Sequence, residues 1–371
     1  MGIDLLNFAE GEPDFSTPQH IKDSAYIAMQ EDFTKYTAVE GIEELRSAIC
    51  EKLKYENNVY YNPSQIIVSS GAKQALFNAF MALCDRGDQV LLPVPCFSSY
   101  MDQIKITGAT PVLVPTDKAN KYRITANDLR KHFSPKVKAV VLNSPCNPSG
   151  AVIERDHLEE IAEFVVEQNI WVITDEVYEK ILHDNNEYIS IASLGEAIKK
   201  RTITINGLSK TYAMTGWRLG YAAGPEDIIA AMAKIQTHAT SNANSIAQKA
   251  AIAALSGPQE PANEMAAAYS RRMEHVYEGL NSLPGVSCLR PAGGFYAFAC
   301  IQDLYGARFG RETLTNETEI VTFLLTEANI AVVPGEAFYY PGYFRFCFAT
   351  SMDNISKGLD RMDRAFRKLE F

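Results

Sequence analysis

The sequence predicts an α/β protein in which a mostly parallel sheet is covered by helices on both faces and is followed by a smaller α+β domain. Short runs rich in valine and isoleucine alternate with longer segments of helical periodicity, and this alternation is typical of parallel sheets. Several of the runs are apolar on both faces, which indicates strands buried from two sides. After about residue 225 the pattern changes to a long helical region and then to short, separated strands.

Seven runs are the expected strands of the large sheet. They are Gln65–Ser69, Gln89–Pro93, Thr110–Pro115, Val137–Asn143, Ile170–Thr174, Thr202–Ile205 and Leu219–Ala223. Between them, Ala72–Cys84 and Arg155–Gln168 carry apolar residues at helical spacing, so we expect helices there. Ligands of such sheets bind beyond the carboxyl ends of the strands, and the residues that follow each strand are therefore the first candidates for a site.

The region after residue 225 is expected to complete the large domain and to form the smaller one. Helix is expected over Asp227–Gln236 and again, after a polar segment, up to about Asn281. Strand-like pieces follow at Phe295–Cys300, Ile330–Val333 and Tyr343–Phe348. We therefore predict a large domain of residues 31–270 and a small domain built from residues 1–30 and 271–371.

Composition limits the class of protein. The chain has 371 residues, enough for two domains, and its net charge of -10 includes no basic stripe, which argues against nucleic acid as a partner. Its seven cysteines show no CxxC pair and no zinc-like spacing, so we expect reduced thiols and no metal site. The N-terminus does not resemble a signal peptide, and no apolar run is long enough for a bilayer. We expect a cytoplasmic protein with no membrane partner.

Two turns containing glycine or proline follow expected strands. The segment Ser70–Lys73 opens a helix, and the free N–H groups at a helix N-terminus can bind a phosphate. A simple helix cap would explain the same residues. Further on, the two prolines and the glycine of Ser144–Gly150 direct Asn147 outward, although a rigid turn alone also accounts for them.

Charged residues follow two other expected strands. Asp175 comes directly after a buried run, and such a carboxylate needs a partner to offset its desolvation. That partner is either a cationic ligand group or a structural one, such as a helix N-terminus or an ion pair. Lys210 and Arg218 share the next connection. A lysine in a desolvated site loses its proton more readily and can form a Schiff base, whereas an isolated lysine is ordinarily a surface charge.

Taken together and in this order, the motifs resemble the class I/II aminotransferases, which are fold type I enzymes that use pyridoxal 5'-phosphate. The most specific stretch is SKTYAMTGWRLGY, at residues 209–221, and DEVY and NPSG are less specific. The resemblance extends over nearly the whole chain. It implies a transferase with a large domain around a mostly parallel seven-stranded sheet and a smaller α+β domain.

The resemblance also implies roles around the cofactor ring. Lys210 would hold the cofactor as an imine and, once substrate displaces it, would move a proton between the substrate α-carbon and the cofactor. Asp175 would pair with the protonated ring nitrogen. Tyr178 and Asn147 would contact the 3'-oxygen of the ring. Phe97 would stack on the ring, at a position where relatives usually have tryptophan or tyrosine.

A phosphate cradle and a second subunit follow from the same resemblance. The residues implied for the cradle are Gly71, Ala72, Ser209 and Arg218. Gly207 stands where many relatives carry serine, so one phosphate contact is missing or is replaced by a backbone group. Tyr36 matches a tyrosine that reaches the phosphate of the neighbouring subunit, which implies a homodimer with shared active sites.

Substrate recognition is implied at the other side of the site. Arg345 matches the arginine that binds the substrate α-carboxylate through two parallel hydrogen bonds, and Gly11 and Asn147 lie beside the same carboxylate in the family. Lys73 belongs to GAKQALFN, which is similar to the text of bacterial and archaeal aspartate aminotransferases. In that branch this lysine can contact the distal carboxylate of an acidic substrate. In this chain Lys73 would either contact that distal carboxylate or only add positive charge near the phosphate.

The implied reaction is transfer of an amino group from an amino acid to a 2-oxo acid by a ping-pong mechanism, with aspartate and 2-oxoglutarate as the favoured pair. Two alternatives remain open: C–S β-lysis on the same scaffold, and transamination of aromatic or other neutral amino acids. Relatives carry a longer segment before the motif that contains Gly11. Any selectivity that this segment supports, and its effect on closure of the active site, do not follow from the sequence.

Overall fold

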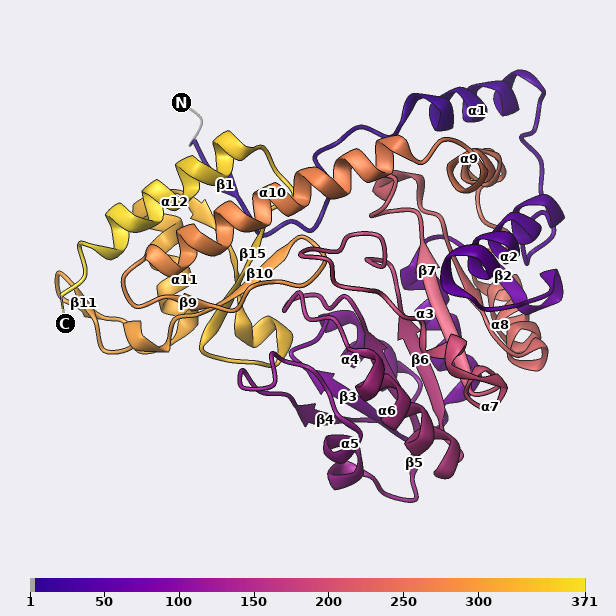
Figure 1. Cartoon of the computed structure of the whole chain (residues 1–371), viewed down its shortest axis with the longest axis horizontal. Helices are drawn as coiled ribbons and strands as arrows, with labels where there is room; N and C mark the ends of the chain where they lie inside the picture. Colours follow the sequence, from indigo (N-terminus) through magenta and orange to yellow (C-terminus); the bar gives the residue numbers. More distant parts are fainter. Residues whose placement is uncertain (1–3, 371) are drawn as a thin grey trace.

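The computed structural model describes residues 4–370, and a twisted seven-stranded sheet forms the centre of its larger part (Figure 1). The strands are β2 (Ile66–Ser69), β3 (Gln89–Val94), β4 (Thr110–Pro115), β5 (Val137–Asn143), β6 (Trp171–Asp175), β7 (Thr202–Gly207) and β8 (Gly220–Ala223). Their order is β2-β8-β7-β6-β5-β3-β4, and β8 alone runs antiparallel to its neighbours. The predicted α/β fold with a mostly parallel seven-stranded sheet is confirmed.

Five of the seven strands differ from their predicted bounds by one or two residues, and two of these differences affect the site. Asp175 is the last residue of β6 and not the first residue after it, because it still pairs with Asn143 of β5 and Ile205 of β7. Strand β7 continues to Gly207, which pairs with Gly220 of β8. Both strands therefore extend further toward the site than the sequence pattern indicated, and Asp175 lies within the sheet itself.

Helices cover both faces of this sheet, as the apolar runs predicted. One face packs against α3 (Ala72–Leu83), α4 (Ser98–Ile106) and α8 (Glu226–Ala239), and the other against α5 (Ala126–His132) and α6 (Arg155–Glu167). Within β3, Val90 and Leu92 face the first group and Leu91 faces the second. Burying one such side chain stabilises the fold by roughly 1.5–3 kcal/mol, so both faces contribute to the core.

A third layer lies over the β2–β8 end of the sheet. It consists of α1 (Gln19–Gln30), α2 (Glu43–Asn57) and α9 (Ser245–Ser256), with α1 packed along α9 (Figure 1). The short helix α7 (Glu196–Lys199) precedes β7. The long helix α10 (Glu260–Ser282) then leads away from this layer toward the C-terminal part of the molecule.

The C-terminal part is built around an antiparallel sheet of order β14-β15-β10-β9. Its strands are β9 (Ser287–Cys288), β10 (Tyr296–Cys300), β14 (Val333–Pro334) and β15 (Tyr343–Cys347), covered by α11 (Glu317–Ala328) and α12 (Met352–Phe366). Strands β11 (Arg308–Phe309) and β12 (Glu312–Thr313) form a separate hairpin. At the start of the described chain, β1 (Leu6–Asn7) pairs with β13 (Ile330–Ala331).

The single strand expected over residues 330–333 is wrong in detail. It is divided into β13 and β14, which pair with different partners, β1 and β15. The predicted division into domains at residues 31 and 270 stays a prediction, and residues 1–3 and 371 lie outside the described residues. None of the helices in residues 4–370 combines the length and the apolar character needed to cross a membrane.

Candidate active site

A cavity of about 390 Å³ opens at the carboxyl ends of the central strands, where the C-terminal part meets the large sheet. It brings together most of the residues that the sequence singled out. Those that line it are Gly11, Ala72, Lys73, Phe97, Asn147, Asp175, Tyr178, Ser209, Lys210, Arg218 and Arg345. Residues more than 300 positions apart in the chain thus share one wall, and this clustering is what a single site requires.

Lys210 follows β7 and is half-buried in the cavity wall. Its Nζ donates a hydrogen bond to the carbonyl oxygen of Gly11 at 2.6 Å, and it lies near the rings of Tyr178 and Phe295. Burial lowers the pKa of Lys210 to about 8. A buried amine with such a pKa carries a larger uncharged fraction near neutral pH than an ordinary lysine, which is what a nucleophilic or proton-transferring lysine needs.

Asp175 ends β6 and is buried beside the cavity. Its Oδ2 accepts a hydrogen bond from the hydroxyl of Tyr100 at 2.6 Å, and its Oδ1 accepts one from the backbone N–H of Val177 at 3.4 Å. Burial raises the pKa of Asp175 to about 6, although these hydrogen bonds and the charge of Lys210 act in the opposite direction. A carboxylate in this setting can be kept ionised by a cationic group of a ligand.

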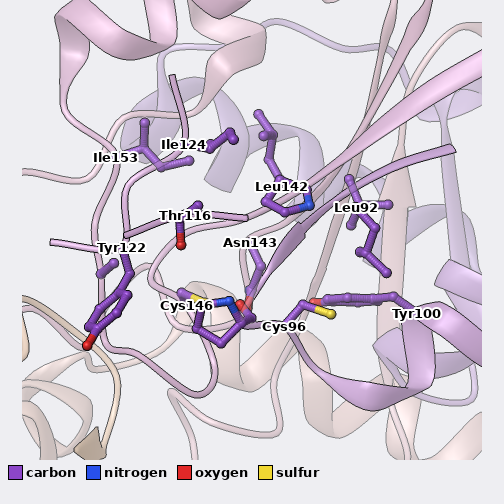
Figure 2. A pocket seen from close by; sticks show the side chains of 14 residues that line it. Leu92, Cys96, Tyr100, Thr116, Tyr122, Ile124, Leu142, Asn143, Cys146 and Ile153 are labelled. Atoms are coloured by element: carbon purple, nitrogen blue, oxygen red, sulfur yellow. The ribbon is translucent and has the colours of Figure 1, made fainter. Parts of the chain in front are cut away.

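Asn143 orders the segment that carries Asn147. Its Nδ2 donates to the carbonyl oxygen of Asp175 at 3.0 Å, and its Oδ1 accepts from the backbone N–H of Asn147 at 2.9 Å. Asn143 and Tyr100 also line a second, smaller cavity of about 30 Å³ behind the site, where Figure 2 shows them with Cys96 and Cys146. A cavity of this size has room for about one or two waters, so it extends the polar surroundings of the site without adding a binding pocket.

Tyr178 and Tyr296 join the two parts of the molecule. Their hydroxyl groups lie 2.8 Å apart, and both side chains are buried. Tyr296 belongs to β10, so it comes from the C-terminal sheet. A Cβ on Gly11 would lie 2.2 Å from the Tyr296 hydroxyl oxygen, and only glycine fits there. The predicted glycine is thus required by the close approach of this tyrosine.

Arg345 on β15 is a buried cation with uncharged neighbours. Its Nη1 donates to Oδ1 of Asn147 at 2.9 Å and its Nη2 donates to the carbonyl oxygen of Ala9 at 2.5 Å. Its Nε is buried and has no hydrogen-bond partner within residues 4–370. Burying a charge without a counter-ion is costly. An anionic ligand group at this end of the cavity would supply both the missing charge and the missing acceptor.

Glycines and Arg218 form the opposite end of the cavity. Gly71 precedes α3 with φ +90°, and a Cβ there would lie 2.6 Å from Nη2 of Arg218. The backbone of Arg218 is also left-handed, and its Nη1 donates to the carbonyl oxygen of Thr215 at 2.8 Å. A free helix N-terminus beside a guanidinium is an arrangement that binds phosphate.

Gly207 lies beside this end of the cavity. A Cβ on it would be 3.2 Å from the carbonyl oxygen of Leu219, 3.3 Å from Cα of Gly220 and 3.7 Å from Cβ of Ala72. The position is therefore tightly packed against the neighbouring strand and the start of α3. A side chain there would have to displace backbone, and close packing replaces the serine that many relatives have.

The mouth of the cavity carries charges of both signs. Nζ of Lys73 lies 5.1 Å from the centre of the Phe97 ring, within the range of a cation–π contact. Glu10 and Glu12 also line the cavity, and Glu12 accepts a hydrogen bond from the hydroxyl of Thr215. Sequence reasoning did not single out these two glutamates as site residues.

Two predicted residues do not line the cavity. Gly71 lies directly behind Arg218, as described above. Tyr36 is 91% exposed and makes no contribution to the cavity within this chain. Its expected role toward a neighbouring subunit stays a prediction.

Among known proteins, the family described as Aminotransferase class I and II matches residues 3–362. The chain belongs to this family, whose members depend on pyridoxal phosphate, and is an aminotransferase. It is similar to the aspartate aminotransferase of Bacillus sp. (strain YM-2), with 42% identity over 363 residues, 98% of this chain and 92% of the relative.

Two solved structures show the same likeness. A crystal structure of the aspartate aminotransferase from Rhizobium meliloti superposes with a TM-score of 0.96 at 40% identity, over 99% of this chain and 92% of the other. A crystal structure of an aromatic aminotransferase from Pyrococcus horikoshii superposes with a TM-score of 0.94 at 39% identity, over 99% and 97%. Proteins named for different substrates thus share the fold.

Proposed function

We propose that this chain uses pyridoxal 5'-phosphate, bound in the 390 Å³ cavity, to transfer an amino group from an amino acid to a 2-oxo acid. The observation that carries the proposal is that three side chains around one cavity have the chemistry that the cofactor and the substrate require. A half-buried lysine with a lowered pKa, a buried aspartate and a buried arginine whose Nε has no partner within residues 4–370 all border the same space. These groups would serve the amine, the ring nitrogen and a carboxylate, respectively.

The residues fit the cofactor at each of its functional groups. The phosphate would rest at the N-terminus of α3, on Gly71 and Ala72, with Ser209 and Arg218 beside it. Phe97 would cover one face of the ring, while Tyr178 and Asn147 would contact its 3'-oxygen. When bound, pyridoxal phosphate supplies an electron sink for the carbanion at the substrate α-carbon.

The side chains of this protein would perform the remaining work. Lys210 would hold the cofactor covalently, and its amine, once released, would take the proton from the substrate α-carbon. Asp175 would hold a proton on the ring nitrogen by pairing with it as a carboxylate. Arg345 would bind the substrate α-carboxylate with two parallel hydrogen bonds, which orients the α C–H bond toward Lys210.

Aspartate is the amino donor that we propose, with 2-oxoglutarate as acceptor. The relatives named aspartate aminotransferase support this choice, as does Lys73, a cation on the cavity wall in addition to Lys210, Arg218 and Arg345. A second candidate is an aromatic amino acid, favoured by the likeness to the Pyrococcus horikoshii enzyme and by the rings of Phe97 and Tyr296 at the cavity.

We also propose a cytoplasmic homodimer in which Tyr36 reaches the phosphate of the neighbouring subunit. Its 91% exposure leaves the side chain free for such a contact. Within each chain we propose the two domains 31–270 and 1–30 with 271–371. Separate buried cores around the large sheet and around the C-terminal sheet support two domains, whereas the packing of α1 along α9 does not support placing residues 19–30 in the small one.

The proposal is tested by steady-state kinetics on the purified chain loaded with pyridoxal phosphate. With aspartate and 2-oxoglutarate varied together, double-reciprocal plots should give parallel lines, because a ping-pong mechanism releases the first product before the second substrate binds. A panel of acidic, aromatic and neutral donors, followed by the absorbance of the bound cofactor, ranks the substrates. Converging lines, or release of pyruvate from cystathionine without amine transfer, would contradict the proposal.

A further inference from the structure

A buried polar cluster lies behind the cavity wall, outside the site described above. The end of β6 and the turn after it face two ways: Asp175, Val177 and Tyr178 line the cavity, whereas Glu179 does not. Glu179 is buried on the far side, against α2 and the end of β7. Its backbone N–H donates to the carbonyl oxygen of Glu176 at 3.0 Å, which closes the turn that carries Tyr178.

Both carboxylate oxygens of Glu179 are fully used. Oε1 accepts from Nζ of Lys52 and, at 2.7 Å, from Nδ2 of Asn206, and Oε2 accepts from Nδ2 of Asn57 at 2.6 Å. Burial alone would raise the pKa of Glu179, but the charge of Lys52 and these three hydrogen bonds outweigh it and hold the pKa below its ordinary value. Glu179 is therefore a buried, ionised and fully partnered carboxylate.

Lys52 provides the matching charge. It lies on α2, is 8% exposed, and also donates to Oδ1 of Asn57 at 2.7 Å. A buried ion pair contributes little net stability compared with well-packed apolar residues, whereas removing one partner alone is strongly destabilising. The pair therefore needs an explanation other than stability.

Asn206 connects the cluster to the loop that carries Lys210. It is the penultimate residue of β7, and while its Nδ2 donates to Glu179, its Oδ1 accepts from the backbone N–H of Gly207 at 2.7 Å. The contacts thus run from α2 through Glu179 and Asn206 to Gly207, where β7 ends and the Lys210 loop begins. Glu179 also directly follows Tyr178, which lines the cavity.

We propose that Glu179, held by Lys52 and joined to Asn206, is a positioning residue that fixes the Asp175–Tyr178 turn relative to the Lys210 loop. This inference rests on the proposed function, because the turn and the loop would hold groups that contact the same cofactor ring. Active sites lose activity steeply when reacting groups move by about 1 Å, by up to about 100-fold. A fully partnered carboxylate between two strand ends restricts such movement.

Three variants separate positioning from stability. Glu179→Met leaves the buried Lys52 with only the more distant carboxylate of Glu56, 3.6 Å from its Nζ, so it should lower both the melting temperature and the activity. Lys52→Met with Glu179→Met removes both charges and should recover much of the stability, but it does not restore the contact to Asn206. Lys52→Met with Glu179→Gln retains an acceptor for Asn206 without a buried charge and should recover both properties. Arg123→Met, which breaks the Arg123–Glu154 ion pair elsewhere, is the matched control.

The first readout needs no cofactor. In the cofactor-free chain, the pH dependence of Lys210 acylation by acetic anhydride, measured by peptide mass spectrometry, should have its midpoint near 8, the pKa of Lys210. In Glu179→Met and in the double methionine variant, a looser loop exposes Lys210 to water. The midpoint should then rise by about half a pH unit or more, toward the ordinary pKa of lysine.

The second readout is a division between kcat and KM in the loaded enzyme. In the same two variants kcat should fall about tenfold or more, whereas KM for the amino donor, set by Arg345 on a different sheet, should change less than about threefold. Recovery of the Lys210 midpoint and kcat together with stability in the double methionine variant would overturn the proposal, as would wild-type values in all three. If the unsubstituted chain fails to bind pyridoxal phosphate, the proposed function fails, while the acylation experiment still tests the positioning.

Discussion

The hydrogen bond from Tyr100 to Asp175 links one hydroxyl group to the charge state of the site. Of the hydrogen bonds that keep the pKa of Asp175 from rising further, this one acts most strongly. Because the carboxylate form is the one that pairs with a ring nitrogen, the cofactor-free chain should bind pyridoxal phosphate more tightly as pH increases through this pKa. Tyr100→Phe removes the donor, so the pKa of Asp175 in the cofactor-free chain should increase and this pH dependence of cofactor binding should move to higher pH by about one unit. Fluorescence titration with pyridoxal phosphate from pH 5 to 8 measures this shift; an unmoved pH dependence would exclude the proposed coupling.

Lys210 has opposite effects on activity and stability. Its pKa of about 8 lies below the 10.5 of an ordinary lysine, so the folded chain disfavours the charged form. The resulting cost to stability is absent above pH 10.5, develops as pH falls toward 8, and is complete below it. Lys210→Met should therefore abolish turnover and raise the free energy of unfolding of the cofactor-free chain by about 3 kcal/mol at pH 7.

Chemical denaturation at pH 7 and pH 10.5 checks this prediction, because the gain in stability should shrink at the higher pH. The same variant should still retain pyridoxal phosphate non-covalently, through the phosphate cradle and Asp175, as measured by equilibrium dialysis. Normal turnover by Lys210→Met would refute the central assignment.

At the scale of elements, the start of α3 depends on a glycine that has no substitute. Gly71 combines φ +90° with the close approach of Arg218. Gly71→Ala should cost about 1–3 kcal/mol in stability and should weaken the binding of pyridoxal phosphate by at least about tenfold, because the guanidinium must move away. Gly216→Ala is the control, since no atom lies within 4 Å of an added Cβ there. Fluorescence titration with the cofactor compares the two variants, and equal affinities would contradict the proposal that Gly71 and Arg218 form the phosphate site.

Sequence patterns predicted the elements of the large sheet well because burial from both faces imposes continuous apolar runs. Polar residues at the ends of such runs also marked Asp175, Lys210 and Arg218 as candidates, but only the resemblance to the family implied roles for them. The same patterns did not predict the division of residues 330–333 into β13 and β14, because each short strand is defined by its partner and not by its own residues.

Other site residues have no signal of their own in the sequence. Tyr296 is one aromatic among many until β10 brings it within 2.8 Å of Tyr178. Glu10 and Glu12 resemble ordinary surface charges. Asn143, by contrast, is a polar residue at the end of a buried strand, the same signal that identified Asp175, and that signal would have found it.

At the scale of the whole molecule, the proposed dimer can be tested by mixing subunits. If Tyr36 acts in the neighbouring site, a hybrid of one Tyr36→Ala chain and one Lys210→Ala chain contains one intact site and one doubly altered site. Random mixing of the two inactive variants should then restore about a quarter of the wild-type activity. Unfolding and refolding the two together, followed by an activity assay, measures this; no recovery, despite dimers seen by sedimentation, would place Tyr36 outside the neighbouring site.

The reversed direction of β8 determines how Lys210 and Arg218 can vary. Because β8 runs antiparallel to β7, the segment between Gly207 and Gly220 leaves the sheet and returns to it at the same edge. A parallel strand would have required a crossover to the opposite edge, with only one of the two residues near the cavity. In evolutionary terms, the distance between the amine and the guanidinium is thus encoded by the length of one loop, and insertions or deletions there are expected to be selected against more strongly than changes of its individual side chains.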